Sequence, residues 1–374
     1  MKIALVDISG KVPFYEHALC KSLNEYARVE LCTPYDVKTE YGATYPVFKL
    51  IRFFDHKKQN GNKILKALEG LCNYIYLLIA HVFKRYDVIH FQWFPFLEFA
   101  GFERHFLRIY KLITPNCKII LTQHNTYPHN SSEPLRLKYK SRFHAIDKFI
   151  DKYIVHTESS KEALHKEFGI SYVKIEMVYH GIFVPDVMPL KTSNNEKMKF
   201  LMFGTQSKYK GTDLFVDAVA GLAKDFLNQL DITIAGKTSQ ELLDNKLKMA
   251  QSLGIKWESR FFEDRELNQI IMNSDVLVFP YRSISQSGAL LLALAFGKPM
   301  IVSRIPSFIE TLDGFPEEAF VEVDSVKSLQ HAIINHVNGT VNIKKEVEVI
   351  ARLQDKYSWR NSAKKTIELY KTNK

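Results

Sequence analysis

Residues 275–299 read DVLVFPYRSISQSGALLLALAFGKP, and this stretch decides the fold of the second half of the chain. It begins with an apolar run, 275–280, that has the length and bulk of a buried parallel strand. A small polar loop follows and opens onto an apolar helix near Gly288. Free backbone N–H groups and the positive end of the helix dipole point outward at such a junction, which suits an anion. The stretch therefore predicts a parallel α/β sheet that binds a phosphorylated ligand.

A second strand-to-helix junction lies upstream, where residues 200–211 read FLMFGTQSKYKG. An apolar strand runs into a glycine-punctuated turn at Gly204 and Thr205, and an amphipathic segment follows over 213–223. Two such units facing one crevice would hold a diphosphate. We expect Lys210, helped by Lys208, to supply the compensating positive charge. The other expected contacts are the loop residues Gln286, Ser287, Gly288 and Ala289.

The predicted elements alternate between strand and helix along the whole chain, which favours two doubly wound units with parallel sheets. In the first half we expect strands at 3–8, 29–32, 88–91, 118–122, 152–156 and 175–178. In the second half we expect them at 199–203, 231–235, 256–261, 275–279, 299–302 and 319–323. Two prolines and a polar cluster at 185–197 predict the linker. The expected domains are 1–185 and 198–355, with a C-terminal helix at 356–374 that packs back toward the N-terminal domain.

The order and spacing of these pieces resemble a GT-B glycosyltransferase of retaining family 4. The pieces that carry the resemblance are the two junctions, Ile232-Thr233-Ile234-Ala235-Gly236 and Phe296-Gly297-Lys298-Pro299 in the second half, and the following in the first: Asp7-Ile8-Ser9-Gly10, Asp87-Val88-Ile89-His90, Thr122-Gln123-His124-Asn125 and Val178-Tyr179-His180-Gly181. The resemblance implies the α/β GT-B fold, in which two Rossmann-like domains face an inter-domain cleft. It also implies sugar transfer, with retention, from a nucleotide-diphosphate sugar to a glycan or lipid-linked glycan, in cell-surface polysaccharide synthesis.

The chain departs from the family pattern at three positions. Members usually carry two glutamates eight residues apart around the 285–288 loop, and the register of residues 293–299 places Ile284 and Leu292 there. An arginine usually follows the glycine at Gly204, where this chain has Thr205. We therefore expect a divergent subgroup in which the loop at 286–288 takes over polar contacts.

Further candidate site residues follow the strand ends. His124 occupies the position of the family's inter-domain histidine, and we expect it to be catalytic together with Lys210. Gly10 and Lys11 follow the first strand, where a glycine allows a phosphate to approach the backbone; a plain turn glycine explains Gly10 equally well. Glu310 resembles an acidic position of the family near the donor, although an exposed helix glutamate is an equal interpretation.

Composition excludes several other classes of function. The four cysteines show no metal-ligand spacing, and no carboxylate pattern accompanies the histidines, so we expect no metal and no cofactor besides the nucleotide-sugar substrate. No helix-turn-helix, zinc-finger or RNA-binding pattern is present, so nucleic acid is not expected as a partner. The first apolar run, 3–6, is broken by Asp7 and is interpreted as a strand, not as a signal peptide. We expect a cytoplasmic protein.

Positive charge is concentrated in the first half. Residues 1–185 hold 26 Lys and Arg against 18 Asp and Glu, whereas the whole chain has a net charge of +10. Six basic residues and one acidic residue lie in 49–66 among aromatic and aliphatic side chains. This segment is typical of a contact with anionic lipid at the inner face of the membrane. The alternative, that its lysines only solvate a loop and a helix, stays open.

Two other functions stay open from the sequence. The first is a non-catalytic partner subunit whose missing glutamates record lost activity. The second is a nucleotide-sugar epimerase of the same fold, which needs carboxylates that the predicted cleft motifs do not offer.

Overall fold

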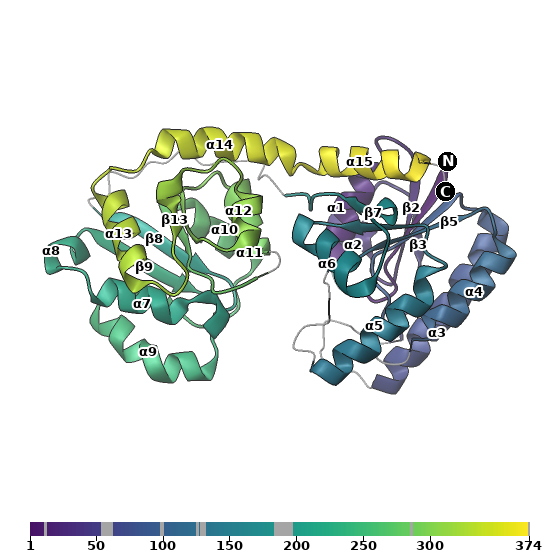
Figure 1. Ribbon diagram of the computed structural model, residues 1–374, viewed down its shortest axis with the longest axis horizontal. Coiled ribbons are helices and arrows are strands. Elements are labelled where there is room, and N and C mark those ends of the chain that lie inside the picture. Colours follow the sequence, from purple (N-terminus) through teal and green to yellow (C-terminus); the bar gives the residue numbers. More distant parts are fainter. Residues whose placement is uncertain are drawn as a thin grey trace. The chain divides into compact units, whose positions relative to one another are not determined.

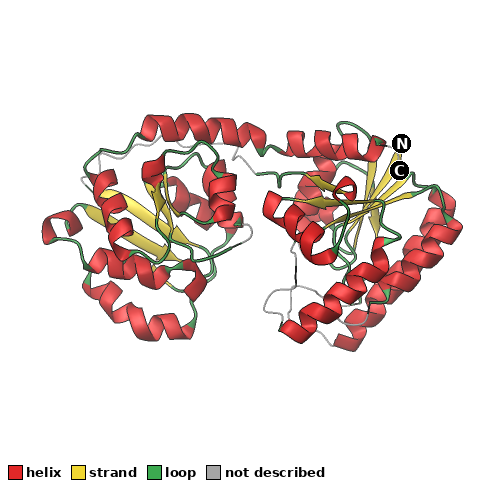
Figure 2. Cartoon of the chain, in the orientation of Figure 1, coloured by secondary structure: helices red, strands yellow, loops and turns green. Residues whose placement is uncertain are grey.

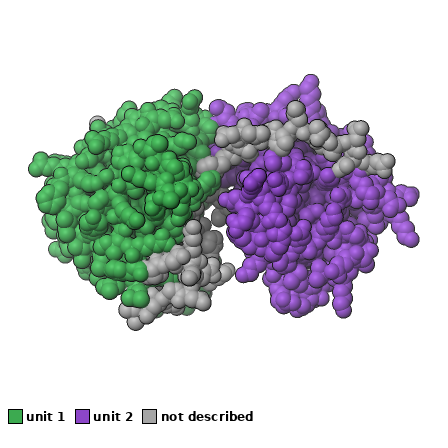
Figure 3. Space-filling model, turned by 180° about the vertical axis from the view of Figure 1, so that it is seen from behind, with its two compact units in different colours: residues 1–181, 358–374 green, residues 182–357 purple. Residues whose placement is uncertain are grey.

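The structure is a computed structural model that describes residues 1–10, 13–53, 63–97, 101–124, 127, 132–182, 197–284 and 287–372. The chain forms two compact units (Figure 3). Unit 1 contains residues 1–181 and 358–374, and unit 2 contains residues 182–357. Each unit is a parallel sheet with helices on both faces (Figures 1 and 2). The expected fold class, GT-B with two Rossmann-like domains, is confirmed at the level of each unit.

Unit 1 is built on a seven-stranded sheet in the order β3-β2-β1-β4-β5-β6-β7, and all neighbouring strands are parallel. Its strands are β1 (Lys2–Val6), β2 (Arg28–Thr33), β3 (Val47–Lys49), β4 (Val88–Phe91), β5 (Lys118–Thr122), β6 (Lys152–Val155) and β7 (Ile175–Met177). The edge strand β3 was not expected from the sequence, because only three residues of it pair with β2.

The helices of unit 1 divide between the two faces of the sheet because side chains alternate along each strand. Ala4 and Val6 face one core and Ile3 and Leu5 face the other. The first face is covered by α3 (Lys63–Lys84), α4 (Glu103–Ile113), α5 (Glu133–Asp147) and α6 (Glu158–Phe168). The second is covered by α1 (Pro13–Leu23), α2 (Val37–Tyr41) and α15 (Trp359–Lys371).

The last helix, α15, completes the second face of unit 1. It packs against α1, and Tyr370 is buried with its hydroxyl 2.7 Å from Nδ1 of His90 in β4. Gly181 lies against the Trp359 ring so closely that a Cβ at this glycine would meet ring atoms at 2.2 Å. The chain therefore returns to unit 1 after forming unit 2.

Unit 2 is built on a six-stranded parallel sheet in the order β10-β9-β8-β11-β12-β13. Its strands are β8 (Met198–Phe203), β9 (Leu230–Ala235), β10 (Lys256–Glu258), β11 (Val276–Phe279), β12 (Met300–Ser303) and β13 (Phe320–Val321). Its helices are α7 (Thr212–Ala220), α8 (Lys224–Leu227), α9 (Gln240–Ser252), α10 (Asp264–Met272), α11 (Gly288–Ala295), α12 (Pro306–Thr311), α13 (Val326–Val337) and α14 (Ile343–Lys356).

Strand order reverses at one point in each sheet. The reversal lies between β1 and β4 in unit 1 and between β8 and β11 in unit 2. In open α/β sheets, ligands bind beyond the carboxyl ends of the strands at this point, because the connections diverge to opposite faces and leave a crevice. We call the residues that follow the strands of each sheet, with the side chains that pack on them, the unit 1 edge and the unit 2 edge.

The expected linker, 185–197, lies outside the described residues except for Lys197. Two expected strands are shorter than the sequence indicated: 256–261 is a strand only over β10, and 319–323 only over β13. Within the described ranges, no helix is both long and apolar enough to cross a bilayer.

Candidate active site

The unit 2 edge is organised around one buried lysine. Lys210 is 7% exposed and ends the short 3₁₀ turn that follows β8. Its Nζ lies 5.1 Å from the centroid of the Tyr281 ring, and no ion pair joins it to a carboxylate of the described residues. Burial lowers the pKa of Lys210 to about 8. A cation that is desolvated without a counter-charge would bind an anionic ligand strongly, because the ligand would compensate the cost of burial.

The loop before Lys210 is shaped by two glycines. Gly204 has φ +92° directly after β8, and a Cβ there would lie 3.0 Å from Nζ of Lys210. Gly236 follows β9 with φ +141°, and a Cβ there would meet the carbonyl oxygen of Gly204 at 2.0 Å. Gln206 fixes the loop from inside, since its Nε2 donates to the Gly204 carbonyl at 2.7 Å and its Oε1 accepts from Thr212 at 2.7 Å. Close backbone approach therefore requires both glycines.

Arg282 connects the two strand-to-helix junctions of unit 2. Its guanidinium donates to both carboxylate oxygens of Asp213, at 2.8 and 2.9 Å, and to the Lys208 carbonyl, while its backbone N–H donates to the Tyr209 carbonyl at 2.7 Å. The neighbouring Gly211 packs so closely on Pro280 that a Cβ would lie 2.0 Å from the Pro280 carbonyl oxygen. These contacts hold the Lys210 turn against the end of β11.

The second junction begins α11 as the sequence predicted. Ser287 is buried, and its Oγ accepts from the Leu290 N–H at 3.2 Å, as an N-cap residue does. Burial raises the pKa of the Tyr281 hydroxyl. Gly288 is exposed, and a Cβ there would have no neighbour within 4 Å. The start of α11 is therefore open at Gly288.

The remaining candidates of unit 2 differ in exposure. Thr205 and Lys208 are exposed, Ala289 is half-buried in the first turn of α11, and Gln286 lies outside the described residues. Glu310 is half-buried on α12. The start of α12 is tied to the loop after β11, because Ser307 Oγ donates to the Ile284 carbonyl at 2.6 Å.

The unit 1 edge is a cluster of rings around His124. His124 is half-buried after β5 and stacks on Trp93, which follows β4, at 4.4 Å between centroids and 18° between planes. Tyr15 of α1 packs edge-on against His124 at 5.1 Å. His156 after β6 and His180 after β7 also contact Tyr15. Burial lowers the pKa of His156 to about 4 and that of His180 to about 3.

A chain of hydrogen bonds fixes the orientation of the His124 ring. Nδ1 of His156 donates to the Val178 carbonyl at 2.8 Å, so Nε2 of this neutral ring is an acceptor. Nδ1 of His124, 3.3 Å away, therefore donates to it. Nε2 of His124 lies 3.2 Å from Oε1 of Gln92, an acceptor, and the amide nitrogen of Gln92 lies 3.2 Å from Nε2 of His90. Hydrogen-bond acceptors therefore face both ring nitrogens of His124, which fixes the orientation of the ring.

Two buried carboxyl groups lie beside this cluster. Asp7 follows β1 and accepts from the Ser9 N–H and hydroxyl at 3.0 and 2.9 Å. Glu16 of α1 is 1% exposed. Burial, and after it the Asp7 carboxylate, raise the pKa of Glu16 well above its ordinary value. The pair therefore favours a protonated Glu16.

The structure gives less support to the two other candidate site residues of unit 1. Gly10 has φ +56°, and a Cβ there would meet the Tyr35 ring at 2.2 Å. Packing under Tyr35 therefore explains the glycine without a ligand. Lys11 lies outside the described residues.

Sequence reasoning missed the residues that position His124 and Lys210. Gln206 and Arg282 carry no signal, because a lone glutamine or arginine in a loop is ordinary. The histidine cluster did carry one: His124, His156 and His180 each follow successive strands β5, β6 and β7, and the carboxyl ends of parallel strands meet at one edge. No group of three or more potential metal ligands occurs in the described part of the chain.

Comparisons with known proteins agree with this architecture. The model "Glycosyltransferase Family 4" matches residues 17–184, and the model "Glycosyl transferases group 1" matches residues 197–338. A similar curated protein is the GDP-mannose:glycolipid 4-beta-D-mannosyltransferase of Xanthomonas campestris pv. campestris, which is 22% identical over 228 residues. That alignment covers 58% of this chain and 61% of the mannosyltransferase.

Two solved structures show the same fold over nearly their whole length. HepE of Anabaena in complex with UDP superposes with a TM-score of 0.70 at 15% identity, covering 99% of both chains. Sucrose-phosphate synthase of Thermosynechococcus elongatus superposes with a TM-score of 0.70 at 17% identity, covering 99% of this chain and 98% of the synthase. With a glycosyltransferase family model on each half and the fold of these proteins, the chain is a GT-B glycosyltransferase.

Proposed function

We propose that this protein is a retaining glycosyltransferase of family 4 that moves a sugar from a nucleotide-diphosphate sugar to a hydroxyl of a glycan or lipid-linked glycan in cell-surface polysaccharide synthesis. The observation that carries the donor part of the proposal is Lys210, a buried ammonium without an ion pair to a described carboxylate, at the switch point of unit 2. Retention rests on the resemblance to family 4.

The unit 2 edge fits the charge that develops on a departing diphosphate. Lys210 would neutralise the leaving phosphates, and the N–H groups at the start of α11 would hydrogen-bond them. Because these groups supply positive charge, we propose that no divalent metal takes part. HepE, with the same fold, is solved with UDP and with UDP-glucose, and the Xanthomonas relative is named for GDP-mannose, so both nucleotides belong in a donor screen.

The unit 1 edge fits an acceptor hydroxyl next to the reacting sugar. The His124 ring is held in one orientation by Trp93 and His156. In the proposal His124 contacts the sugar or the acceptor, and Gly10 and Lys11 are secondary donor contacts. Thr205, Glu310 and the 286–289 loop complete the donor site.

The test is release of nucleoside diphosphate by the purified full chain from UDP-, GDP- and ADP-sugars, with and without an acceptor glycan and with EDTA present. We expect release from one donor class that EDTA does not reduce. Lys210→Ala should lower it strongly, whereas Lys208→Ala, on the exposed neighbour, should lower it much less. Tight nucleotide binding without release would instead support the non-catalytic partner subunit, and interconversion of sugar epimers would support the epimerase.

The partner-subunit alternative is kept because of two side chains. Ile284 and Leu292 stand where the family carries its paired glutamates, and both are half-buried at the unit 2 edge. Leu292→Glu tests the register: if Leu292 faces the donor ribose, the new carboxylate should strengthen nucleotide binding. Unchanged binding by a folded Leu292→Glu variant would contradict this register.

A further inference from the structure

Helix α3 buries three polar side chains among its core-facing residues. Three polar side chains point into the protein: Glu69, Asn73 and His81 are at most 3% exposed. Each has a dedicated partner, since Glu69 accepts from the Phe53 N–H at 2.7 Å, Asn73 pairs with the backbone N–H and carbonyl of Ile51, and His81 bonds Tyr110. The helix is therefore fixed in its rotation by buried polar contacts.

The opposite face of α3 is exposed and apolar. Its side chains recur every three or four residues and form one stripe from Leu65 to Phe83, along about 28 Å of helix. Phe83 is 81% exposed. The members of the stripe are Leu65, Leu68, Leu71, Ile75, Tyr76, Ile79, Val82 and Phe83. No charged residue interrupts it, so a large apolar patch faces outward.

The neighbouring helix α4 continues this patch and then turns basic. Phe106 packs on Tyr74 of α3 at 4.4 Å between centroids, which places this side of α4 next to α3. The exposed residues beside Phe106 on the helix surface are apolar: Phe102, Ile109, Leu112 and Ile113. Arg104 and Arg108 lie on the other side of α4, toward α5.

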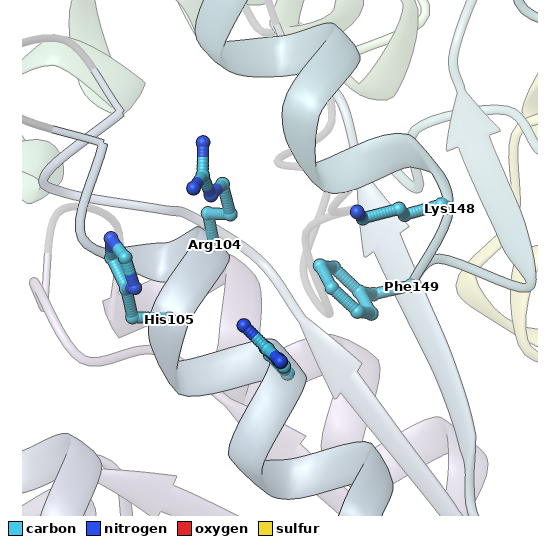
Figure 4. Close-up of a pocket in the computed structure, with 5 residues that line it drawn as sticks. Arg104, His105, Lys148 and Phe149 are labelled. Carbon is cyan, nitrogen blue, oxygen red and sulfur yellow. The ribbon is translucent and has the colours of Figure 1, made fainter.

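A basic pocket lies between α4 and the end of α5 (Figure 4). It has a volume of about 440 Å³ and is lined by Arg104, His105, Arg108, Lys148 and Phe149. Arg104 and Lys148 point into the space between the two helices. Over residues 101–150 the sequence holds nine Lys and Arg and three Asp and Glu. Of these three, Glu103 is buried and Asp147 pairs with Lys174.

We propose that α3, α4 and the end of α5 form a surface that docks unit 1 on a bilayer containing anionic lipid. The apolar stripe would enter the boundary between headgroups and acyl chains, and the basic pocket would hold lipid phosphates. The helix lies along the bilayer and does not cross it, because its other face is occupied by the protein core.

The charge of the surface favours lipid over a second copy of the chain. A symmetric contact between two copies would cover the apolar stripes but would also bring two arginine-rich edges close together. Anionic lipid would contact the apolar stripe with its acyl chains and the basic pocket with its phosphates. The surface overlaps the 49–66 segment expected from the sequence only at the start of α3, and residues 54–62 of that segment lie outside the described residues.

The test is co-sedimentation of the full chain with vesicles of phosphatidylcholine alone or mixed with phosphatidylglycerol. We expect binding only to the mixed vesicles, weakening as salt rises. Ile75→Glu with Ile79→Glu should lower the partition coefficient by ~10-fold or more. Arg104→Glu with Arg108→Glu should lower it by about five-fold for each arginine removed.

The matched control is Val347→Glu, which changes an exposed valine on the amphipathic helix α14 of unit 2 and should leave binding unchanged. All altered residues are exposed, so thermal melting should be the same in every variant. Binding that ignores phosphatidylglycerol, or that survives both double variants, would overturn the proposal. So would loss of binding through Lys57→Glu with Lys58→Glu alone, or a dimer in sedimentation equilibrium that Ile75→Glu dissociates while vesicle binding persists.

Discussion

The unit 1 edge and the unit 2 edge differ in the groups that form them and in the ligand chemistry that they favour. The unit 1 edge is built from rings: Trp93, Tyr15 and three histidines contact one another, and Nδ1 of His124 reaches His156. The unit 2 edge is built from backbone: Gly204 and Gly236 bring main chain close together, and Lys210 is its buried cation. The packed rings hold the histidine side chains in fixed orientations. Backbone without side chains instead leaves room for a polyanion to approach the main chain.

This difference indicates where each kind of substitution should act. Removing a side chain from the unit 1 edge should disturb a proton position and a packed cluster. Removing the cation from the unit 2 edge, or adding bulk to it, should disturb a charged ligand that the protein alone does not need for stability.

The largest effect is expected for Lys210→Ala. A preorganised positive group that stabilises a leaving group contributes about 2–4 kcal/mol to the transition state. We expect turnover to fall accordingly, with a smaller loss of nucleoside diphosphate affinity, measured by steady-state kinetics and calorimetry. Lys208→Ala is the control, and an equal loss in both variants would show that general positive charge matters more than the buried position.

His124→Ala should lower turnover by roughly 10²-fold, because a positioned proton acceptor or hydrogen-bonding group is lost. Nucleotide binding, assigned to the other edge, should be unchanged. The control is His165→Ala, which removes a histidine stacked on Tyr172 at 3.8 Å in the same unit. Normal turnover in a folded His124→Ala variant would return His124 to a packing role.

Gly288→Val should weaken nucleotide binding and turnover together, by about 1–3 kcal/mol, because the side chain would occupy the space of the phosphate. The open surroundings of Gly288 predict little change in the melting temperature. Gly288→Ala should give a smaller effect of the same kind. Unchanged binding of nucleoside diphosphate by folded Gly288→Val would show that the α11 start is not the phosphate site.

The unit 1 edge should make stability depend on pH. Burial lowers the pKa of His90 to about 3, as it does for His156 and His180. The unfolded chain therefore binds more protons below pH ~6.5, so stability present above that pH is lost as pH falls toward the folded values. Each histidine should contribute about 1.4 kcal/mol per pH unit in urea unfolding. His90→Gln should flatten the profile, and an unchanged slope would contradict burial as its cause.

The sequence predicted the parts of the fold that depend on local pattern. Apolar runs such as 275–279 became buried strands, and Ser287 before Gly288 became a helix start. It could not predict that Lys210 is buried, because lysines in loops are ordinarily exposed and only tertiary contacts decide otherwise. The same holds for the exposed stripe of α3, because tertiary contacts such as those of the buried Asn73 decide which side of this helix faces outward.

The position of α15 in unit 1 has a consequence for biosynthesis. Residues 1–181 are synthesised before unit 2, but their second face lacks Ala363, Ile367 and Tyr370 until the segment after unit 2 has also been made. Unit 2 is continuous in sequence, so it can finish folding before the unit that precedes it. A nascent chain stalled before residue 358 should therefore carry a protease-resistant unit 2 and a protease-sensitive unit 1, and it should need a chaperone that tolerates an exposed sheet face.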